Sequence, residues 1–211
     1  MTTRVRIRNA RAAFVELGAP DYFQGKKQRD NDKRRWSSSF ICTPETQASV
    51  DGKTWGPAKA VIDQAIQTEA ANKWGAKGAG YLMSILPDPK GCAFQDGNRK
   101  PDYEGYPGNW VLSAHRTEDK GRPLVLDTDK SPLYQPNNEP FPGKAGRIYS
   151  GAYVNGSVDL WAQDNPSGKG MRAELIGIQF AAKGDAFSGG TPPNPDEFEE
   201  IANGADAEAL A

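Results

Sequence analysis

Residues 147–182 carry the clearest pattern of apolar and polar positions in the chain. Two apolar-rich runs flank the segment DNPSGKG (164–170), whose Asn, Pro and Gly residues are typical of a chain reversal. In the first run the even positions are mostly apolar, and successive side chains of a strand point to opposite faces. We therefore predict a β-hairpin with one face turned to a core, formed by Ile148, Ala152, Val154, Val158 and Leu160.

The odd positions of the same run share the other face, and several of them are aromatic. Tyr149, Tyr153 and Trp161 lie there together with Arg147. Large rings and an arginine on a face that should be solvated indicate a binding surface. Two glycines interrupt the run, as at the bends or bulges of a strongly coiled sheet or small barrel.

The remaining apolar segments are short, and one of them has helical periodicity. Residues 57–74 carry an apolar stripe that begins after Pro57 and ends before Gly75, which are typical helix start and stop residues. Strands are expected at 4–8, 36–42, 81–86, after the loop that begins at 103, and at 122–127, with long loops at 18–35 and 128–146. Many short strands with one helix favour a mainly β, OB-fold-like antiparallel five-stranded barrel with one inserted helix over a parallel α/β fold.

Composition supports one elaborated domain rich in turns. The 211 residues include 23 Gly and 16 Pro, which favours short strands and long loops over a helical bundle. No apolar run approaches the roughly 20 residues that span a bilayer, and the N-terminus lacks an apolar signal core, so export is not expected. Cys42 and Cys92 lie far apart without a partner spacing, and we expect two unpaired thiols.

The net charge of −1 conceals a strong asymmetry. No Lys or Arg follows Lys183, and the segment beyond it carries a charge of −7, which leaves +6 for the preceding residues. We therefore divide the chain into a basic domain, 1–184, and an acidic tail, 185–211, whose low hydrophobicity and turn formers predict disorder. A basic body favours a polyanionic partner, and the tail resembles such a polyanion.

Enzymatic chemistry is weakly represented. His115 is the one histidine, no Cys/His cluster has metal-ligand spacing, and neither a phosphate loop nor a nucleophile elbow is present. Asp102, Glu104 and Asp119 have no spacing that distinguishes them from solvated loop acids. We expect no catalysis, no cofactor and no metal.

Aromatic residues interleaved with cations are the stronger signal. Tyr103, Tyr106 and Trp110 follow one another at spacings of three and four, with glycines between them that permit close approach. Bases stack on such rings at about 1–3 kcal/mol each while Lys and Arg follow the phosphates, so the combination selects unpaired strands. The alternating Arg4, Arg6 and Arg8 fit a phosphate-facing strand or an edge strand kept soluble by charge. Trp110 and Trp161 fit core positions equally well.

Three long motifs add a resemblance. YEGYPGNWVLSA (103–114), GRIYSGAYVNGSVDLWAQDN (146–165) and KGMRAELIGIQFAAKGDAFSGG (169–190) resemble the bacteriophage single-stranded DNA-binding protein family. The resemblance implies an OB-fold that coats exposed single strands during phage replication and recombination, in the cytoplasm of the infected bacterial host. It also implies contacts between an acidic tail and replication proteins. Related phage tails end in an aromatic residue, whereas this chain ends in Leu210 and Ala211, and its nearest aromatic is Phe198.

Pattern and resemblance together predict a surface that binds single-stranded DNA. Its predicted residues are Arg4, Arg6, Arg8, Arg34, Arg35, Trp36, Tyr103, Tyr106, Trp110, Arg147, Tyr149, Tyr153, Trp161, Lys169 and Arg172. The acidic tail would compete for this surface as a tethered polyanion or recruit replication partners. Two alternatives remain: a non-catalytic barrel that binds a protein or a glycan, and a nuclease or annealing enzyme.

Overall fold

The structure, a computed structural model, describes residues 2–30, 32–166 and 168–187. Its strands are β1 (Thr3–Asp21), β2 (Arg35–Cys42), β3 (Gln47–Ser49), β4 (Gly56–Pro57), β5 (Phe94–Asp96), β6 (Trp110–Thr117), β7 (Leu124–Leu126), β8 (Tyr153–Asn165) and β9 (Gly168–Ala182). The α-helices of these described ranges are α1 (Ala58–Trp74) and α2 (Gly78–Ile85). Beyond Phe187, the predicted acidic tail lies outside the described residues.

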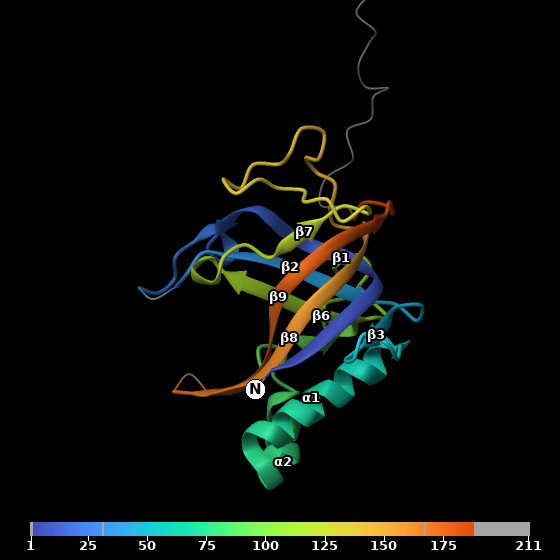
Figure 1. Ribbon diagram of the computed structural model, residues 1–211. Coiled ribbons are helices and arrows are strands. Elements are labelled where there is room, and N and C mark those ends of the chain that lie inside the picture. The colour runs from blue at the N-terminus through green and yellow to red at the C-terminus, as the bar shows by residue number, and fades with distance from the viewer. Residues whose placement is uncertain (1, 31, 167, 188–211) are drawn as a thin grey trace, which may run out of the picture.

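Five strands pair in a closed ring, which agrees with the predicted OB-fold-like barrel (Figure 1). β1 pairs with β2, β2 with β6, β6 with β9, β9 with β8, and β8 again with β1. The expectation of a wholly antiparallel barrel is wrong at one contact, because His115 of β6 pairs in parallel with Glu174 of β9. Parallel neighbours need a long connection, and here the chain passes through β7, a long loop and β8 before it returns.

The hairpin of β8 and β9 confirms the alternation seen in the sequence. From Val154 to Ala162 the even positions of β8 are buried, and the odd positions are partly exposed. Gly156 lies so close to Phe40 that a Cβ would come within 2.5 Å of the ring, so a larger residue would displace it. β8 begins at Tyr153 instead of residue 147, because Gly151, with φ of 106°, turns the chain just before the strand.

β1 is much longer than the predicted strand at 4–8, and its pairing with β8 and β2 contains three register shifts. Its main-core side chains fall on odd positions at first, on even positions from Ala10 to Ala12, and on an odd position again at Leu17. The changes of phase coincide with Asn9 and Phe14, whose φ angles are 58° and 49°. Such left-handed backbone is uncommon outside glycine, and bulges of this kind re-aim side chains.

α1 confirms the helix predicted at 57–74 and covers one end of the barrel (Figure 1). It packs against β1, β3 and β8. The face turned to the barrel is apolar apart from Glu69, which accepts a hydrogen bond from Thr3 Oγ1 at 2.6 Å. Its buried apolar residues are Ala58, Ile62, Ala65, Ile66 and Ala70.

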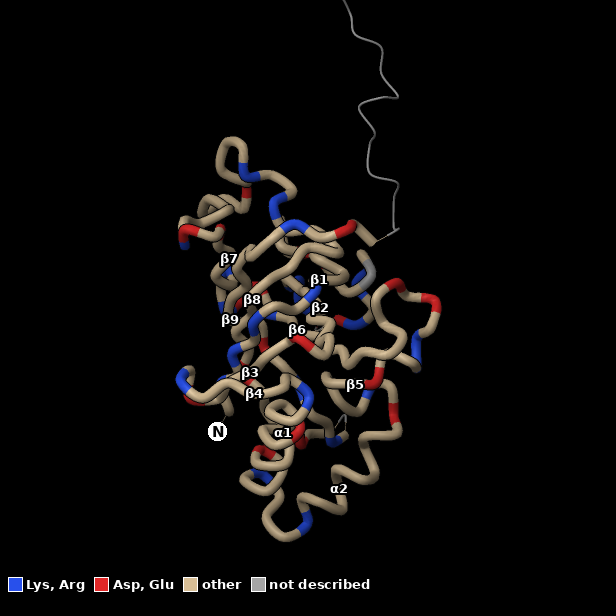
Figure 2. The backbone as a smooth tube through the Cα atoms, turned by 90° about the vertical axis from the view of Figure 1, so that its right-hand side faces the viewer, with Lys and Arg blue, Asp and Glu red and all other residues tan. Residues whose placement is uncertain are grey.

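The prediction of a strand at 81–86 is wrong, because this segment belongs to helix α2. Gly78 lets the chain turn back closely against α1, since a Cβ there would lie 2.8 Å from the carbonyl oxygen of Ala70. Leu82 and Ile85, about one turn apart, are buried. α2 contains no charged residue and is tan along its length in Figure 2. Such a short apolar run fits both helical and strand periods.

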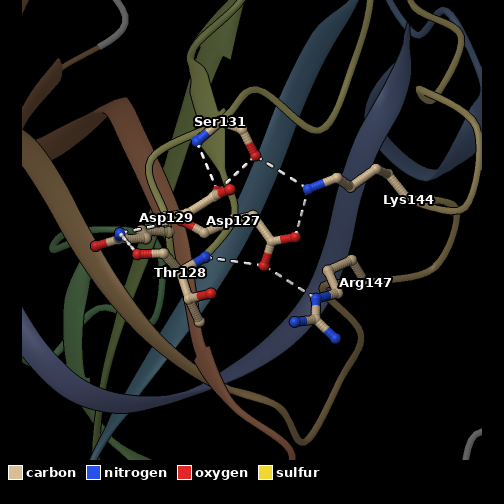
Figure 3. A network of polar contacts seen from close by, with 7 residues as sticks. Asp127, Thr128, Asp129, Ser131, Lys144 and Arg147 are labelled. Carbon is tan, nitrogen blue, oxygen red and sulfur yellow. Dashed lines mark hydrogen bonds and ion pairs between the residues drawn. The ribbon is translucent and has the colours of Figure 1, made fainter.

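Asp127 follows β7 and organises the long loop at 128–146 (Figure 3). Its carboxylate accepts hydrogen bonds from Lys144 Nζ at 2.7 Å, from the backbone N–H of Thr128 at 2.8 Å and from Arg147 Nε at 3.0 Å. The bond from Lys144, followed by those from Thr128 and Arg147, holds the pKa of Asp127 well below its usual range. The carboxylate therefore joins both ends of the loop to β7.

Replacing Asp127 tests this role. Asp127→Asn should let limited proteolysis cut loop 128–146 several-fold faster, because Lys144 and Arg147 lose their charged acceptor. Asp129→Asn is the matched control, since the carboxylate of Asp129 accepts bonds from nearby Ser131 within the loop. Equal cleavage rates of the two variants would contradict the role of Asp127 in holding the loop.

Candidate nucleic-acid interface

A groove of about 320 Å³ lies over the outer face of β2 and β6, and we call it the β2–β6 groove. Four serines, Ser37, Ser38, Ser39 and Ser113, line it. Strand pairing places Ser39 opposite Ser113, and their Oγ atoms are 2.9 Å apart. The floor of the groove is therefore low and polar, and it leaves room for a flat ligand.

A cluster of edge-to-face aromatic rings forms one wall. The ring centroid of Tyr103 is 5.0 Å from that of Phe14 and 5.4 Å from that of Tyr106. Tyr106 is buried, whereas Phe14 is 51% and Tyr103 43% exposed. The register shift between Ala13 and Glu16, with the left-handed backbone of Phe14, turns the ring of Phe14 outward. Buried Tyr106 thus supports two exposed rings.

Phe23 and Arg35 contribute another part of the lining. The ring of Phe23 is 52% exposed, and the guanidinium carbon of Arg35 lies 4.5 Å from its centroid. Burial lowers the pKa of Arg35, while Glu16 and Asp32 oppose the shift. In the described part of the chain, the buried Nε of Arg35 has no hydrogen-bond acceptor. A buried donor without a partner is costly, so an acceptor on a bound ligand would gain a hydrogen bond from this N–H group.

His115 lies beside the serine floor as a neutral ring. Burial, followed by the positive charges of Arg35 and Arg172, lowers its pKa to about 4. A neutral imidazole offers one donor and one acceptor nitrogen. The groove therefore holds a group that can hydrogen-bond to a base edge near neutral pH.

The loop at 22–34 extends the groove with basic residues. Lys33 pairs with Asp119 at 2.6 Å and Arg34 with Glu118 at 2.7 Å, so part of this charge is neutralised. The exposed cations that lie earlier in the loop are Lys26, Lys27 and Arg29. They supply positive charge beside Phe23.

Of the predicted site residues, the structure brings Arg35, Tyr103 and Tyr106 to this groove. Trp36 instead lies in the interior, 4% exposed, and its Nε1–H donates to the carbonyl oxygen of Gly18 at 2.7 Å. Arg122 lies over the same ring at 5.4 Å. Trp36 therefore fastens β2 to the end of β1.

Most of the predicted cations are held by neighbours on the protein. Arg4 pairs with Asp159, Arg34 with Glu118, Arg147 with Asp127, and Lys169 with Asp164. Arg172 donates to Gln163 Oε1 at 3.1 Å and to the carbonyl oxygens of Lys90 and Gly91. Arg6 and Arg8 are exposed, at the other end of β1 from the groove.

The remaining predicted aromatic residues lie apart from the groove. Tyr149 donates its hydroxyl hydrogen to the carbonyl oxygen of Gly184 at 2.8 Å, and Tyr153 lies under the guanidinium of Arg11 at 4.9 Å. Trp110 packs against Phe94 and under Lys59. Trp161 lines a separate cavity between β8 and α1. Tyr149, Tyr153 and Trp110 therefore contact other parts of the protein, and Trp161 lines a cavity of its own.

Phe14, Phe23 and Lys100 are groove residues that are missing from the predicted set. Phe23 could have been predicted from the sequence, because it is an aromatic residue inside a polar, basic loop. Lys100 directly precedes the Tyr103 motif, and its Nζ lies 5.5 Å from the Tyr103 centroid. Phe14 could not have been predicted from the sequence, because its exposure depends on the bulge in β1.

Other chemistry is sparse in the ranges 2–30, 32–166 and 168–187. No group of His, Cys, Asp and Glu side chains suited to a metal ion gathers there. Within the same ranges, no helix is long and apolar enough to cross a membrane. Cys42 and Cys92 are separate buried thiols, and burial raises the pKa of Cys42 to about 12.

Comparison with known proteins identifies the class to which this barrel and groove belong. The chain is a member of a family of phage single-stranded DNA-binding proteins, that of the ssDNA-binding protein of Enterobacter phage Enc34, which matches residues 3–210. A relative, "putative protein p50" of Acyrthosiphon pisum secondary endosymbiont phage 1, is 34% identical over 209 residues, 99% of each chain.

Two solved structures share the fold. The single-stranded DNA-binding protein from bacteriophage Enc34, in complex with ssDNA, has a TM-score of 0.63 and 22% identity, with 87% of this chain and 89% of that chain covered. The single-stranded DNA-binding protein gp2.5 of bacteriophage T7 has a TM-score of 0.52 and 13% identity, with 95% and 97% covered. At these identities the likeness concerns the fold alone.

The pKa of His115 makes stability depend on pH. Because the pKa falls from 6.5 to about 4 on folding, the unfolded chain binds the proton first as the pH drops. The free energy of unfolding should fall between pH 6.5 and 4, by roughly 3 kcal/mol from this group. In urea titrations, the free energy of unfolding of His115→Gln should lack this part of the pH dependence. An unchanged pH dependence would contradict the role given to His115.

Proposed function

We propose that this protein binds single-stranded DNA, without sequence preference, in the β2–β6 groove. The observation that carries the proposal is the combination on one face of exposed rings, a serine floor and Arg35, whose buried Nε has no acceptor in the described residues. In OB-folds the face of the second and third barrel strands binds oligonucleotides. β2 and β6 are the second and third barrel strands in chain order. Family membership supports the same ligand.

The aromatic rings supply affinity that does not depend on base identity. Phe14, Tyr103 and Phe23 expose large parts of their rings at the groove, and each stacked base contributes about 1–3 kcal/mol. A duplex hides the faces of its bases inside the stack. Rings that need a base face therefore select unpaired strands.

Phosphates are bound by cations around the rings. Arg35 and Lys100 lie at the groove, and the exposed lysines of loop 22–34 continue from Phe23. Because binding releases counterions from the DNA, affinity falls as salt rises. This dependence separates a DNA-binding surface from one that binds a neutral glycan.

The protein coats exposed strands during phage replication and recombination, in the cytoplasm of the host. The acidic segment beyond Phe187 competes with DNA at high local concentration or recruits replication proteins. Phe187 supports the competition, because it packs against the small apolar cluster that includes Ile41 and Tyr106. Phe187, the last described residue, therefore lies beside the aromatic wall of the groove.

Truncating the exposed rings tests the stacking. Phe14→Leu and Tyr103→Leu should each weaken binding of oligo-dT about tenfold, within the range of one lost stacking contact. Tyr81→Leu removes a ring from α2, away from the groove, and should leave affinity unchanged. Fluorescence titration at one fixed salt concentration measures all three, and equal affinities would argue against the groove.

A second substitution tests the phosphate contacts. Lys100→Gln should weaken binding to all oligonucleotide sequences alike and reduce the slope of log affinity against log salt by about 0.7. Lys77→Gln, an exposed cation at the helical end, is the control. A change in sequence preference with an unchanged salt slope would contradict a phosphate contact.

A further inference from the structure

A second cationic surface lies on the first half of β1, away from the β2–β6 groove. Arg6 and Arg8 are exposed there, whereas Arg4 is neutralised by Asp159. The guanidinium carbon of Arg8 lies 3.6 Å from the ring centroid of Trp55, an arrangement that fixes both side chains. Arg6 lies over Gly52, so both arginines border the loop at 50–56.

A cavity of about 310 Å³ separates this loop from α1. Trp55, Val50, Val61 and Ala65 line it with apolar surface, and Val50 is 48% exposed. Thr54, Gln64 and Thr68 add polar groups to the lining. Arg8 lies over one face of the Trp55 ring and is not among the residues that line the cavity, whereas Trp55 itself lines it.

Asp51 is the acidic residue of the loop at 50–56, and its carboxylate closes this loop. Asp51 accepts hydrogen bonds from Ser49 Oγ at 2.9 Å and from the backbone N–H groups of Lys53 and Thr54, both at 2.7 Å. These bonds stabilise its charge and hold the loop in shape. Asp51 also lines the cavity, and the positive charges of Arg6, Arg8 and Lys53 around the loop exceed its single negative charge.

This arrangement matches the chemistry of one nucleotide. A base has a flat apolar face that stacks on an indole ring and a polar edge that hydroxyl and amide groups can bind. Its flanking phosphates need cations nearby, and Arg8 lies beside the Trp55 ring while Arg6 lies beside Gly52 of the same loop. The cavity volume is at the lower end of the range for small-ligand sites.

We propose that the cavity at Trp55 is a second nucleotide subsite, with Arg6 and Arg8 on the flanking phosphates, for the DNA strand that occupies the β2–β6 groove. The inference rests on the proposed function of that groove. β1 connects the two sites, and at about 3.3 Å per residue Arg8 and Phe14 are roughly 20 Å apart along the strand. A strand that fills the groove alone does not reach Trp55, whereas a longer one does.

Oligonucleotide length separates the two sites. Binding of oligo-dT of about 6 and about 16 nucleotides, within the usual range for one OB-fold, is measured for the full chain and its variants. The double variant Arg6→Gln/Arg8→Gln is compared with Lys77→Gln/Lys130→Gln, which removes the same charge from exposed positions elsewhere. Trp55→Leu tests the stacking separately.

With the shorter oligonucleotide, all proteins should bind alike. With the longer one, the arginine variant should bind about tenfold more weakly than its control, with a salt slope lower by about 1.4, and Trp55→Leu should lose about tenfold. Equal binding of the arginine variant and its control to the longer oligonucleotide would overturn the subsite. Losses of the same size at both lengths would also overturn it, because the arginines would then act on the groove.

The same measurements distinguish failure of the groove proposal from failure of the subsite proposal. If wild type fails to bind the shorter oligonucleotide while the longer one still depends on Arg6, Arg8 and Trp55, the subsite stands and the groove proposal fails. If Phe14→Leu weakens binding at both lengths while the arginine variant matches its control, the groove stands and the subsite fails.

Discussion

The barrel closes because β1 pairs with β8 along its first half and with β2 along its second half. A regular strand could not keep its core side chains inward through both pairings, and the bulges at Asn9 and Phe14 correct the phase. The second bulge also exposes Phe14 at the groove. One irregularity of the backbone therefore serves both the closure of the barrel and the exposure of an aromatic ring at the groove.

Ion pairs divide the basic residues into structural and exposed groups. Arg4, Arg147 and Lys169 each hold an acid that is part of the scaffold. Arg35 differs, because its Nε has no acceptor within the described ranges and its ring contact is to exposed Phe23. The net charge of the body therefore overstates the charge available to DNA, and the position of each cation relative to the rings decides its use.

The parts of the fold that the sequence predicted are those set by local pattern. The alternation of β8 persists over many residues, and α1 has both a periodic apolar face and clear end residues. Tyr103, which lines the groove, was predicted as a site residue because its motif is dense in aromatics and glycines. α2 was missed because its apolar run is short and fits either period.

The site was harder to predict because it depends on contacts distant in sequence. Arg4 and Asp159 are 155 positions apart, and no local pattern shows that they pair. The outward turn of Phe14 requires the register of β1 against β2. Trp36 has the large ring expected of a stacking residue beside two arginines. Its contacts with the carbonyl oxygen of Gly18 and the guanidinium of Arg122 nevertheless hold it in the protein interior.

The most direct test is ultraviolet crosslinking of the full chain to oligo-dT, followed by mass spectrometry of the linked peptides. Thymine crosslinks to rings stacked on it, so the method reports which aromatic residues contact the bases. We expect crosslinks at Phe14, Phe23 and Tyr103, the exposed rings of the β2–β6 groove. Crosslinks confined to Trp110 and Trp161, with none at these three rings, would contradict the account.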